Sequence, residues 1–204
     1  MAFHEQSFEI KALLFISGFV ILSLEMLGIR ILAPYVGTTA PVWAALLGVT
    51  LAGSAVGYYW GGSLADYTQK KAVFLWLAAG ASISIALIPS LRSVVGVAAP
   101  YFGYSGGAFI GAILLFFIPV MFLSAITTYS IRIFVKTLDT IGKIHGDLYA
   151  LTTVGSIVGV FGTSYILVPF FTIPHILYSL SLSIFLFSIS IFLSPPLEEG
   201  YSNS

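Results

Sequence analysis

The sequence predicts an all-α membrane protein, built as a helix bundle with six transmembrane helices. Hydrophobic residues make up 58% of the 204 residues and charged residues only 8%, and the mean hydropathy is +1.04. Six apolar stretches reach the length of about 20 residues that a helix needs to cross the hydrocarbon core of a bilayer. Backbone groups in lipid must be hydrogen-bonded within the spanning element, so we expect these stretches to be helices.

The six predicted spans follow one another with short connections. They are Ala12–Val36, Pro41–Ala65, Ala72–Leu91, Ala108–Tyr129, Leu148–Pro169 and Ile173–Leu193. The remaining segment, Ser93–Gly107, is too short to span and contains a proline, so we expect an interfacial helix or an extracytoplasmic loop. Residues 1–204 are thus predicted to form a single integral membrane domain.

The distribution of basic residues predicts the orientation of the chain in the cell membrane. With the N-terminus inside, the cytoplasmic segments hold six basic residues: Lys11, Lys70, Lys71, Arg132, Lys136 and Lys143. The opposite side holds only Arg30 and Arg92, which agrees with the positive-inside rule. Both termini are therefore predicted to be cytoplasmic. The leader Met1–Lys11 lacks the basic character of a signal peptide, and we expect the first helix to stay in the mature protein.

Composition argues against several classes of function. The formal net charge is zero and no basic stripe is present, so we expect no nucleic-acid partner. Cysteine is absent, which excludes disulfides and a cysteine nucleophile. His145 and His175 are predicted at opposite interfaces, and we expect no metal site and no cofactor. No nucleotide-binding loop or soluble catalytic domain is evident, so the chain is predicted not to be an enzyme.

Two spans carry small residues at four-residue spacing. The second span has Gly53, Gly57 and Gly61, and the fifth has Gly155 and Gly159. Such stripes allow helix backbones to approach closely in membranes. They indicate either tight static packing or smooth faces that slide during a conformational change. Because the stripes fall on the middle helix of each three-helix half, they also suggest a 3+3 repeat, as in many secondary transporters.

Glu25 and Arg30 are the charged residues within the first span. A charge at membrane depth is costly and normally faces a bundle interior or a watery cavity. The two residues are five positions apart, so they do not share a helix face, and each is expected to find its partner on another helix. Pro34 removes the hydrogen bond to the carbonyl of Arg30 and favours a bent helix end. These residues are interpreted either as a substrate pathway or as parts of a structural interhelical ion pair, and a protonated, neutral Glu25 is a further alternative.

Two further polar positions have both a structural and a functional interpretation. Arg132 follows a polar run in the fourth span, beyond Pro119, and is interpreted as the inner end of a polar pathway or as part of a repaired helix kink. Asp147 precedes the predicted start of the fifth helix at Leu148. It is expected to act as a helix cap that accepts hydrogen bonds from the first amides.

The sequence resembles the membrane domain of transmembrane spermidine-synthase-like proteins, in which a major-facilitator-like region is fused to an aminopropyltransferase. The similar stretches are Ser23–Gly37 with Val42-Trp43, Leu51–Asp66, Arg132, and Gly146–Gly159. No position of this chain matches the aminopropyltransferase active site, so the resemblance does not imply spermidine synthase activity here.

A second resemblance concerns the loop after the second span. Gly62, Asp66, Lys70 and Lys71 match, in type and spacing, the loop between the second and third helices of major-facilitator transporters. Gln69 replaces a glycine of that pattern. The resemblance implies a cytoplasmic position for this loop.

These observations favour a transporter-like unit for a small polar solute, with a polyamine as one candidate. A six-helix unit would need a second copy to enclose a path, so a homodimer is expected. The alternative is a membrane anchor or sensor for a separately encoded spermidine synthase, which would then be a soluble or membrane-bound partner.

Overall fold

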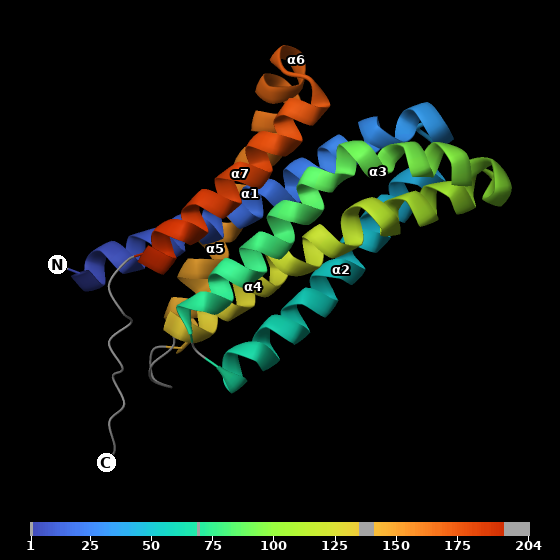
Figure 1. Cartoon of the computed structure of the whole chain (residues 1–204). Helices are drawn as coiled ribbons and strands as arrows, with labels where there is room; N and C mark the ends of the chain where they lie inside the picture. The colour runs from blue at the N-terminus through green and yellow to red at the C-terminus, as the bar shows by residue number, and fades with distance from the viewer. Residues whose placement is uncertain (1, 69, 135–140, 194–204) are drawn as a thin grey trace.

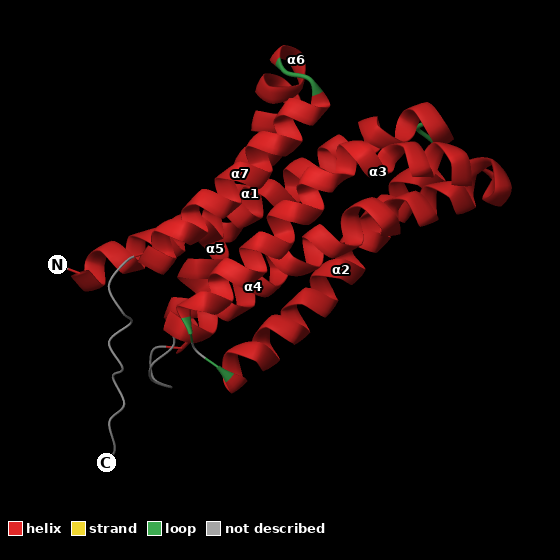
Figure 2. Cartoon of the chain, in the orientation of Figure 1, coloured by secondary structure: helices red, strands yellow, loops and turns green. Residues whose placement is uncertain are grey.

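The computed structural model describes residues 2–68, 70–134 and 141–193 (Figure 1). All regular structure within these ranges is helical, which confirms the predicted fold class (Figure 2). The elements are α1 (Ala2–Val36), α2 (Ala40–Tyr67), α3 (Lys71–Ala112), η1 (Ile113–Phe117), α4 (Ile118–Phe134), α5 (Ile141–Phe161), η3 (Gly162–Leu167), α6 (Val168–Phe170) and α7 (Ile173–Leu193). Six helical segments are long and apolar enough to cross a membrane, as expected of a multi-pass membrane protein.

The six segments extend the predicted spans at most of their ends. They run over Phe8–Val36, Ala40–Tyr67, Lys71–Ala99, Tyr101–Arg132, Gly142–Phe170 and Ile173–Leu193. The sixth agrees at both boundaries with the prediction. The others gain turns because polar residues at a bilayer interface remain compatible with a helix even though they end an apolar pattern.

The segment Ser93–Gly107 is helical over most of its length. The helix that begins at Lys71 continues through it and is broken by backbone geometry only at Gly103, where φ is 68° and ψ is 172°. Glycine adopts a positive φ without the steric cost that other residues meet. Gly103 therefore lets the chain reverse within a short distance, and Figure 1 shows the chain turning back within α3 before it continues into η1 and α4. The expected separate interfacial helix or loop is replaced by extensions of the two flanking spans.

Proline in two spans is accommodated by widened helical turns. Each π-type segment ends two residues before a proline, η1 before Pro119 and η3 before Pro169. A proline lacks the amide hydrogen and crowds the preceding turn, and a local change to π geometry lets the helix continue. The expected interruption at Pro119 is thus a bulge within a continuous span.

Three pairs of helices form the closest contacts of the bundle: α1 with α5, α2 with α4, and α3 with α7. The core lies around α1 and α4. In the most apolar 18-residue stretch of each span, the share of buried residues is 61% in Phe8–Val36 and 56% in Tyr101–Arg132. The share is only 17% in Gly142–Phe170. The fifth span therefore lies at the periphery, and Figure 1 shows the η3–α6 end standing apart from the far end of α2–α4.

The α3–α7 pair is joined by a reciprocal pair of hydrogen bonds. The Ser82 hydroxyl donates to the Ser181 carbonyl at 2.9 Å, and the Ser181 hydroxyl donates to the Ser82 carbonyl at 2.8 Å. Hydroxyl groups satisfied in this way can lie in an apolar bundle at little cost. The two bonds fix the register of α3 against α7 near the middle of both spans.

Candidate functional site

Glu25 is buried on the central helix α1. It is 9% exposed and is the only charged residue among the buried residues that the structure describes. Within those residues it forms no hydrogen bond or ion pair, so the expected partner on another helix is not found. On the helix surface, Glu25 adjoins Leu22 and Ile29, at positions three before and four after it. Leu22 and the neighbouring Met26 are half-buried, so the carboxyl lies at the border of a partly exposed stripe of α1.

The surroundings of Glu25 are defined by residues on either side of it along α1. A Cβ at Gly28 would lie 2.8 Å from a methyl of Leu46 on α2 and 3.2 Å from the ring of Phe116. On nearly the opposite face of α1, the Ser23 hydroxyl accepts a hydrogen bond from Thr163 of η3 at 2.7 Å. Glu25 therefore adjoins apolar side chains toward α2, and the buried hydroxyl pair lies on another face of α1.

Arg30 lies apart from Glu25. Its side chain is exposed, near the end of α1 that also approaches the Gly37 turn, and within the described residues it has no hydrogen bond or ion pair. A long basic side chain near a helix end can extend its charged group into the interface while its stem covers apolar surface. The structure therefore does not bring the two charges of α1 together.

Arg132 and Asp66 form an ion pair that joins the ends of α4 and α2. Arg132 Nε lies 2.8 Å from Asp66 Oδ1, and the two side chains are 48% and 66% exposed. From the sequence alone, Arg132 is interpreted as part of a polar pathway and Asp66 as part of a loop motif. Sequence spacing carries no signal for this contact, because the residues are 66 positions apart. Arg132 thus links the ends of α4 and α2, and it lies far along the bundle from Arg30.

The rest of the loop motif lies around this ion pair. Gly62 lies against Thr128, because a Cβ at Gly62 would be 3.4 Å from the Thr128 methyl group. Lys70 is exposed, and Lys71, the first residue of α3, is half-buried. We call the end of the bundle with these residues, Arg132 and Lys143 the basic end.

Tyr129 holds the α2–α3 connection against α4. Its hydroxyl lies 3.0 Å from the Thr68 carbonyl and 2.9 Å from the Lys70 carbonyl. Its ring is fully buried and packs edge-on against Phe74, with centroids 4.9 Å apart. The Thr68 carbonyl follows the end of α2, where helix carbonyls lack partners of their own, whereas the Lys70 carbonyl also accepts a hydrogen bond from the Val73 amide. Nothing in the sequence spacing singled out this residue.

The glycine stripe of α2 lies directly against the backbone of η1 and α4. A Cβ at Gly53, Gly57 or Gly61 would lie 3.0, 2.2 or 2.5 Å from a carbonyl oxygen of the facing segment. The contacted residues are Phe117, Met121 and Ala125, each 64 positions after its glycine. The constant register means that the two helices run in parallel. Any side chain larger than hydrogen would push them apart.

The glycine stripe of α5 makes the same contact with α1. A Cβ at Gly155 would lie 2.1 Å from the Phe15 carbonyl oxygen, and one at Gly159 would lie 2.3 Å from that of Phe19. Thr163 continues the stripe and donates to Ser23, whose hydroxyl lies 3.5 Å from the Gly159 carbonyl. Both glycine stripes are therefore surfaces of close helix contact.

Polar side chains of α2, α4 and α5 also lie near one another. Tyr58 of α2 is close to Tyr149 of α5 and to Ser124 of α4. The Ser124 hydroxyl is fully buried. Tyr149 also stacks on His145, with ring centroids 5.6 Å apart. Tyrosines near membrane interfaces are common, so neither tyrosine stood out in the sequence.

Asp147 does not cap a helix. The helix α5 begins at Ile141, so Asp147 lies in its second turn, and its side chain is exposed. The predicted start at Leu148 was wrong because the helix begins seven residues earlier and continues through Gly142 and Gly146. A glycine costs only about 1 kcal/mol in a helix interior, which a long helix tolerates.

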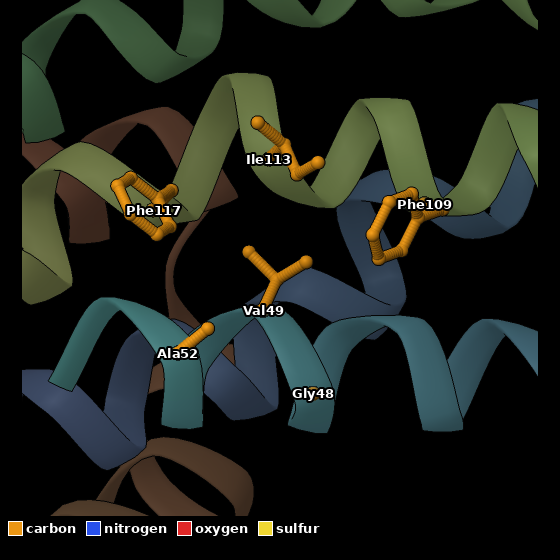
Figure 3. Close-up of a pocket in the computed structure, with 6 residues that line it drawn as sticks. All are labelled: Gly48, Val49, Ala52, Phe109, Ile113 and Phe117. Atoms are coloured by element: carbon orange, nitrogen blue, oxygen red, sulfur yellow. The ribbon is translucent and has the colours of Figure 1, made fainter. Parts of the chain in front are cut away.

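An apolar groove lies between α2 and the facing stretch of α3 and η1. Figure 3 shows Val49 of α2 pointing toward Ile113, with Phe109 and Phe117 on either side of it. Gly48 and Ala52 complete the lining, which contains no polar side chain. The groove therefore offers nothing that would bind a polar solute, and it is distinct from the polar positions described above.

Within the described part of the chain, no three His, Asp or Glu side chains gather closely enough to hold a metal ion. Comparison of the chain with protein-family models, with curated proteins and with solved structures finds no match. The assignment of function therefore depends on the chain itself.

Proposed function

We propose that the chain is a transporter-like membrane unit whose solute path passes Glu25. The observation that supports this most strongly is the burial of that carboxyl in an otherwise apolar bundle. A charged group kept at membrane depth, against its solvation cost, is by default a functional group. Its position beside the half-buried stripe of Leu22 and Met26 gives a solute a side from which to reach it.

A 3+3 repeat would explain how the unit is built, and the contacts of the bundle support it. Adding 102 to Gly53 and Gly57 gives Gly155 and Gly159, and subtracting 102 from the contacted Phe117 and Met121 gives Phe15 and Phe19. The α2–α4 contact therefore corresponds to the α5–α1 contact residue by residue. Under the same exchange of halves, α3 and α7 correspond to each other, in agreement with the reciprocal Ser82–Ser181 bonds.

The sequence carries the same offset. Gly53-Ser-Ala-Val-Gly57 and Gly155-Ser-Ile-Val-Gly159 share four of five residues, and Ile-Arg-Ile occurs at 29–31 and again at 131–133. Because three spans is an odd number, the second half would cross the membrane in the opposite sense to the first. Inverted repeats of this kind build many secondary transporters, with the site at the interface between the repeats.

A single unit leaves much of α2 and α5 uncovered, and two copies would be needed to enclose a path. We therefore propose a homodimer in the cell membrane, with the basic end and both termini on the cytoplasmic side. The positive-inside rule supports this orientation. The transported solute is proposed to be small and polar, with polyamines among the first candidates because of the family resemblance.

Uptake by proteoliposomes tests the proposal. Purified protein should carry labelled candidate solutes, polyamines included, faster than empty vesicles do. The Glu25→Gln variant should lose this flux, and Asp147→Asn, which changes an exposed carboxyl outside the core, should keep it. Absence of flux in folded protein, or a Glu25→Gln variant equal to the unmodified chain, would count against transport.

The second candidate function is that of a membrane anchor or sensor for a separate aminopropyltransferase. The family resemblance favours it, together with the acidic pair Glu198-Glu199, which lies outside the described residues. Co-purification in mild detergent with a synthase expressed beside it is the test. A folded membrane protein that retains no such enzyme would contradict this function and leave the first one standing.

A further inference from the structure

The charge balance in the interior of the bundle points to the kind of ligand that the path takes. Among the described residues, every Lys, Arg and Asp is exposed or half-buried, and Glu25 alone of the charged residues is buried. The interior therefore carries a single acidic group and no basic group to balance it. An interior of this kind favours cations and disfavours anions.

The helices around α1 do not supply a counter-charge for Glu25. Of the described titratable groups on the helices that contact α1, none forms a hydrogen bond or an ion pair with its carboxyl. These groups include Tyr58 on α2, Arg92 on α3, Tyr129 and Arg132 on α4, Tyr149 on α5, Tyr165 on η3, and His175 and Tyr178 on α7. On α1 itself, Arg30 is exposed on another face, five positions away. Arg132, which could neutralise the carboxylate, is engaged with Asp66, and the Tyr129 hydroxyl, which could only donate a hydrogen bond, is engaged with loop carbonyls.

A buried carboxyl with no such partner is neutralised by a proton or by a bound cation, because an isolated ion in a medium of low dielectric constant is very costly. Glu25 is also not sealed off, since 9% of its surface remains accessible beside Leu22 and Met26. Access and the lack of a fixed partner together mean that the neutralising group can exchange.

We propose that Glu25 is an exchangeable cation site, which holds a proton when empty and releases it when the ammonium group of a solute takes its place. The carboxyl O–H bond breaks and its proton passes to water as the ammonium group arrives, so one positive charge replaces another at the carboxylate. The proposal rests on the proposed function, because it assigns the solute a positive charge and makes the proton the exchanged ion.

Labelling with dicyclohexylcarbodiimide tests the site directly. This apolar carbodiimide reacts with protonated carboxyls in membranes, and peptide mass spectrometry locates the adduct. We expect Glu25 to be labelled at acidic pH and labelling to fall several-fold as the pH rises. Glu25→Asp should retain labelling at the same position, and Glu25→Gln should lose it. Glu9, on the same helix but hydrogen-bonded to Ser190, provides a control within the chain.

Competition tests the second half of the proposal. Tetramethylammonium carries a permanent charge and no reactive N–H, so at fixed pH and ionic strength it should lower the labelling of Glu25 several-fold relative to sodium chloride. No labelling of Glu25 at acidic pH in protein that elutes as a single folded species would overturn the proton site. Labelling that is equal in both salts would overturn the exchange. Labelling needs no flux, so a chain that labels as expected but carries no solute contradicts the transport proposal alone.

Discussion

The α2–α4 pair and the α1–α5 pair use the same glycine contact but keep their polar groups at different depths. In α2–α4, the charged partners Asp66 and Arg132 lie at the helix ends and are about half exposed. In α1–α5, the polar partners Ser23 and Thr163 are fully buried. An exposed ion pair is weakened by water and salt, whereas a buried hydrogen bond is protected from both. The comparison indicates that the backbone contact holds each pair together, while the polar groups serve distinct roles at the end and in the interior.

The difference also concerns Glu25. Its helix, α1, carries a buried charged residue, whereas the buried polar residues of α4, Ser124, Thr127 and Ser130, carry only hydroxyl groups. The position in α4 that corresponds to Glu25 at an offset of 102 is Thr127, whose hydroxyl donates to the Leu123 carbonyl at 3.2 Å. At these two positions, the first repeat that we propose carries the Glu25 carboxyl, and the second carries the Thr127 hydroxyl, which is hydrogen-bonded.

The largest effect is expected from filling the glycine contacts. Gly57→Ala and Gly155→Ala each place a Cβ within 2.2 Å of a carbonyl oxygen, so the helices must separate. We expect each variant to lose about 1–3 kcal/mol of unfolding free energy, the usual range for an overpacked core. Thermal unfolding in detergent measures the loss, and Gly48→Ala, which meets no atom within 4 Å, is the matched control. If either Gly57→Ala or Gly155→Ala is as stable as Gly48→Ala, the α2–α4 and α1–α5 pairs do not share the same glycine contact.

A smaller effect is expected from the buried hydroxyl pair. Thr163→Val keeps the shape of the side chain but removes the donor to Ser23, and we expect a loss of about 0.6–2 kcal/mol, as found for hydrogen bonds between membrane helices. The same unfolding assay applies. The double variant with Ser23→Ala should lose less stability than the sum of the two single losses, since both variants remove the same hydrogen bond, while Ser23→Ala also removes the contact of its hydroxyl with the Gly159 carbonyl. Additive losses would contradict a direct coupling between the two residues.

The smallest effect is expected from the exposed ion pair. Asp66→Asn and Arg132→Gln should each cost about 0–1 kcal/mol, and the difference from the unmodified chain should shrink as salt is added. A double-variant cycle measured at low and high ionic strength isolates the pair. A coupling well above this range that persists in high salt would mean that the basic end is more shielded than the exposed fractions of these side chains imply.

The sequence was sufficient for the helices but not for most contacts between them. Length and hydropathy place the six spans because burial in lipid demands both, and the sixth span agrees at both ends. The glycine stripes were visible because four-residue spacing puts residues on one helix face. Which helix each stripe contacts, and the meeting of Asp66 with Arg132, depend on packing between distant segments and leave no local signal. The 3+3 repeat remains a prediction, although Gly-Ser-x-Val-Gly recurs at a fixed offset of 102 in the sequence itself.

Two local predictions were wrong for reasons that follow from backbone energetics. The helix continues through Ser93–Ala99, beyond the span predicted to end at Leu91, and α5 includes Gly142–Asp147, ahead of the span predicted to begin at Leu148. Weak helix formers at a bilayer interface need not end a helix that is held by its neighbours, because tertiary packing outweighs intrinsic propensity. Asp147 therefore loses its role as a cap.

The central claim is that the stripe of α1 beside Glu25 faces water inside the bundle rather than lipid, and cysteine labelling tests it most directly. The native chain has no cysteine, so single replacements report without background. Met26 is half-buried, whereas Ile83 on α3 is 61% exposed in the structure. We expect a water-soluble thiosulfonate to modify Met26→Cys at least about tenfold faster than Ile83→Cys, because thiols in lipid remain protonated and react slowly. Equal rates, or faster modification of Ile83→Cys, would contradict a sheltered aqueous path along α1.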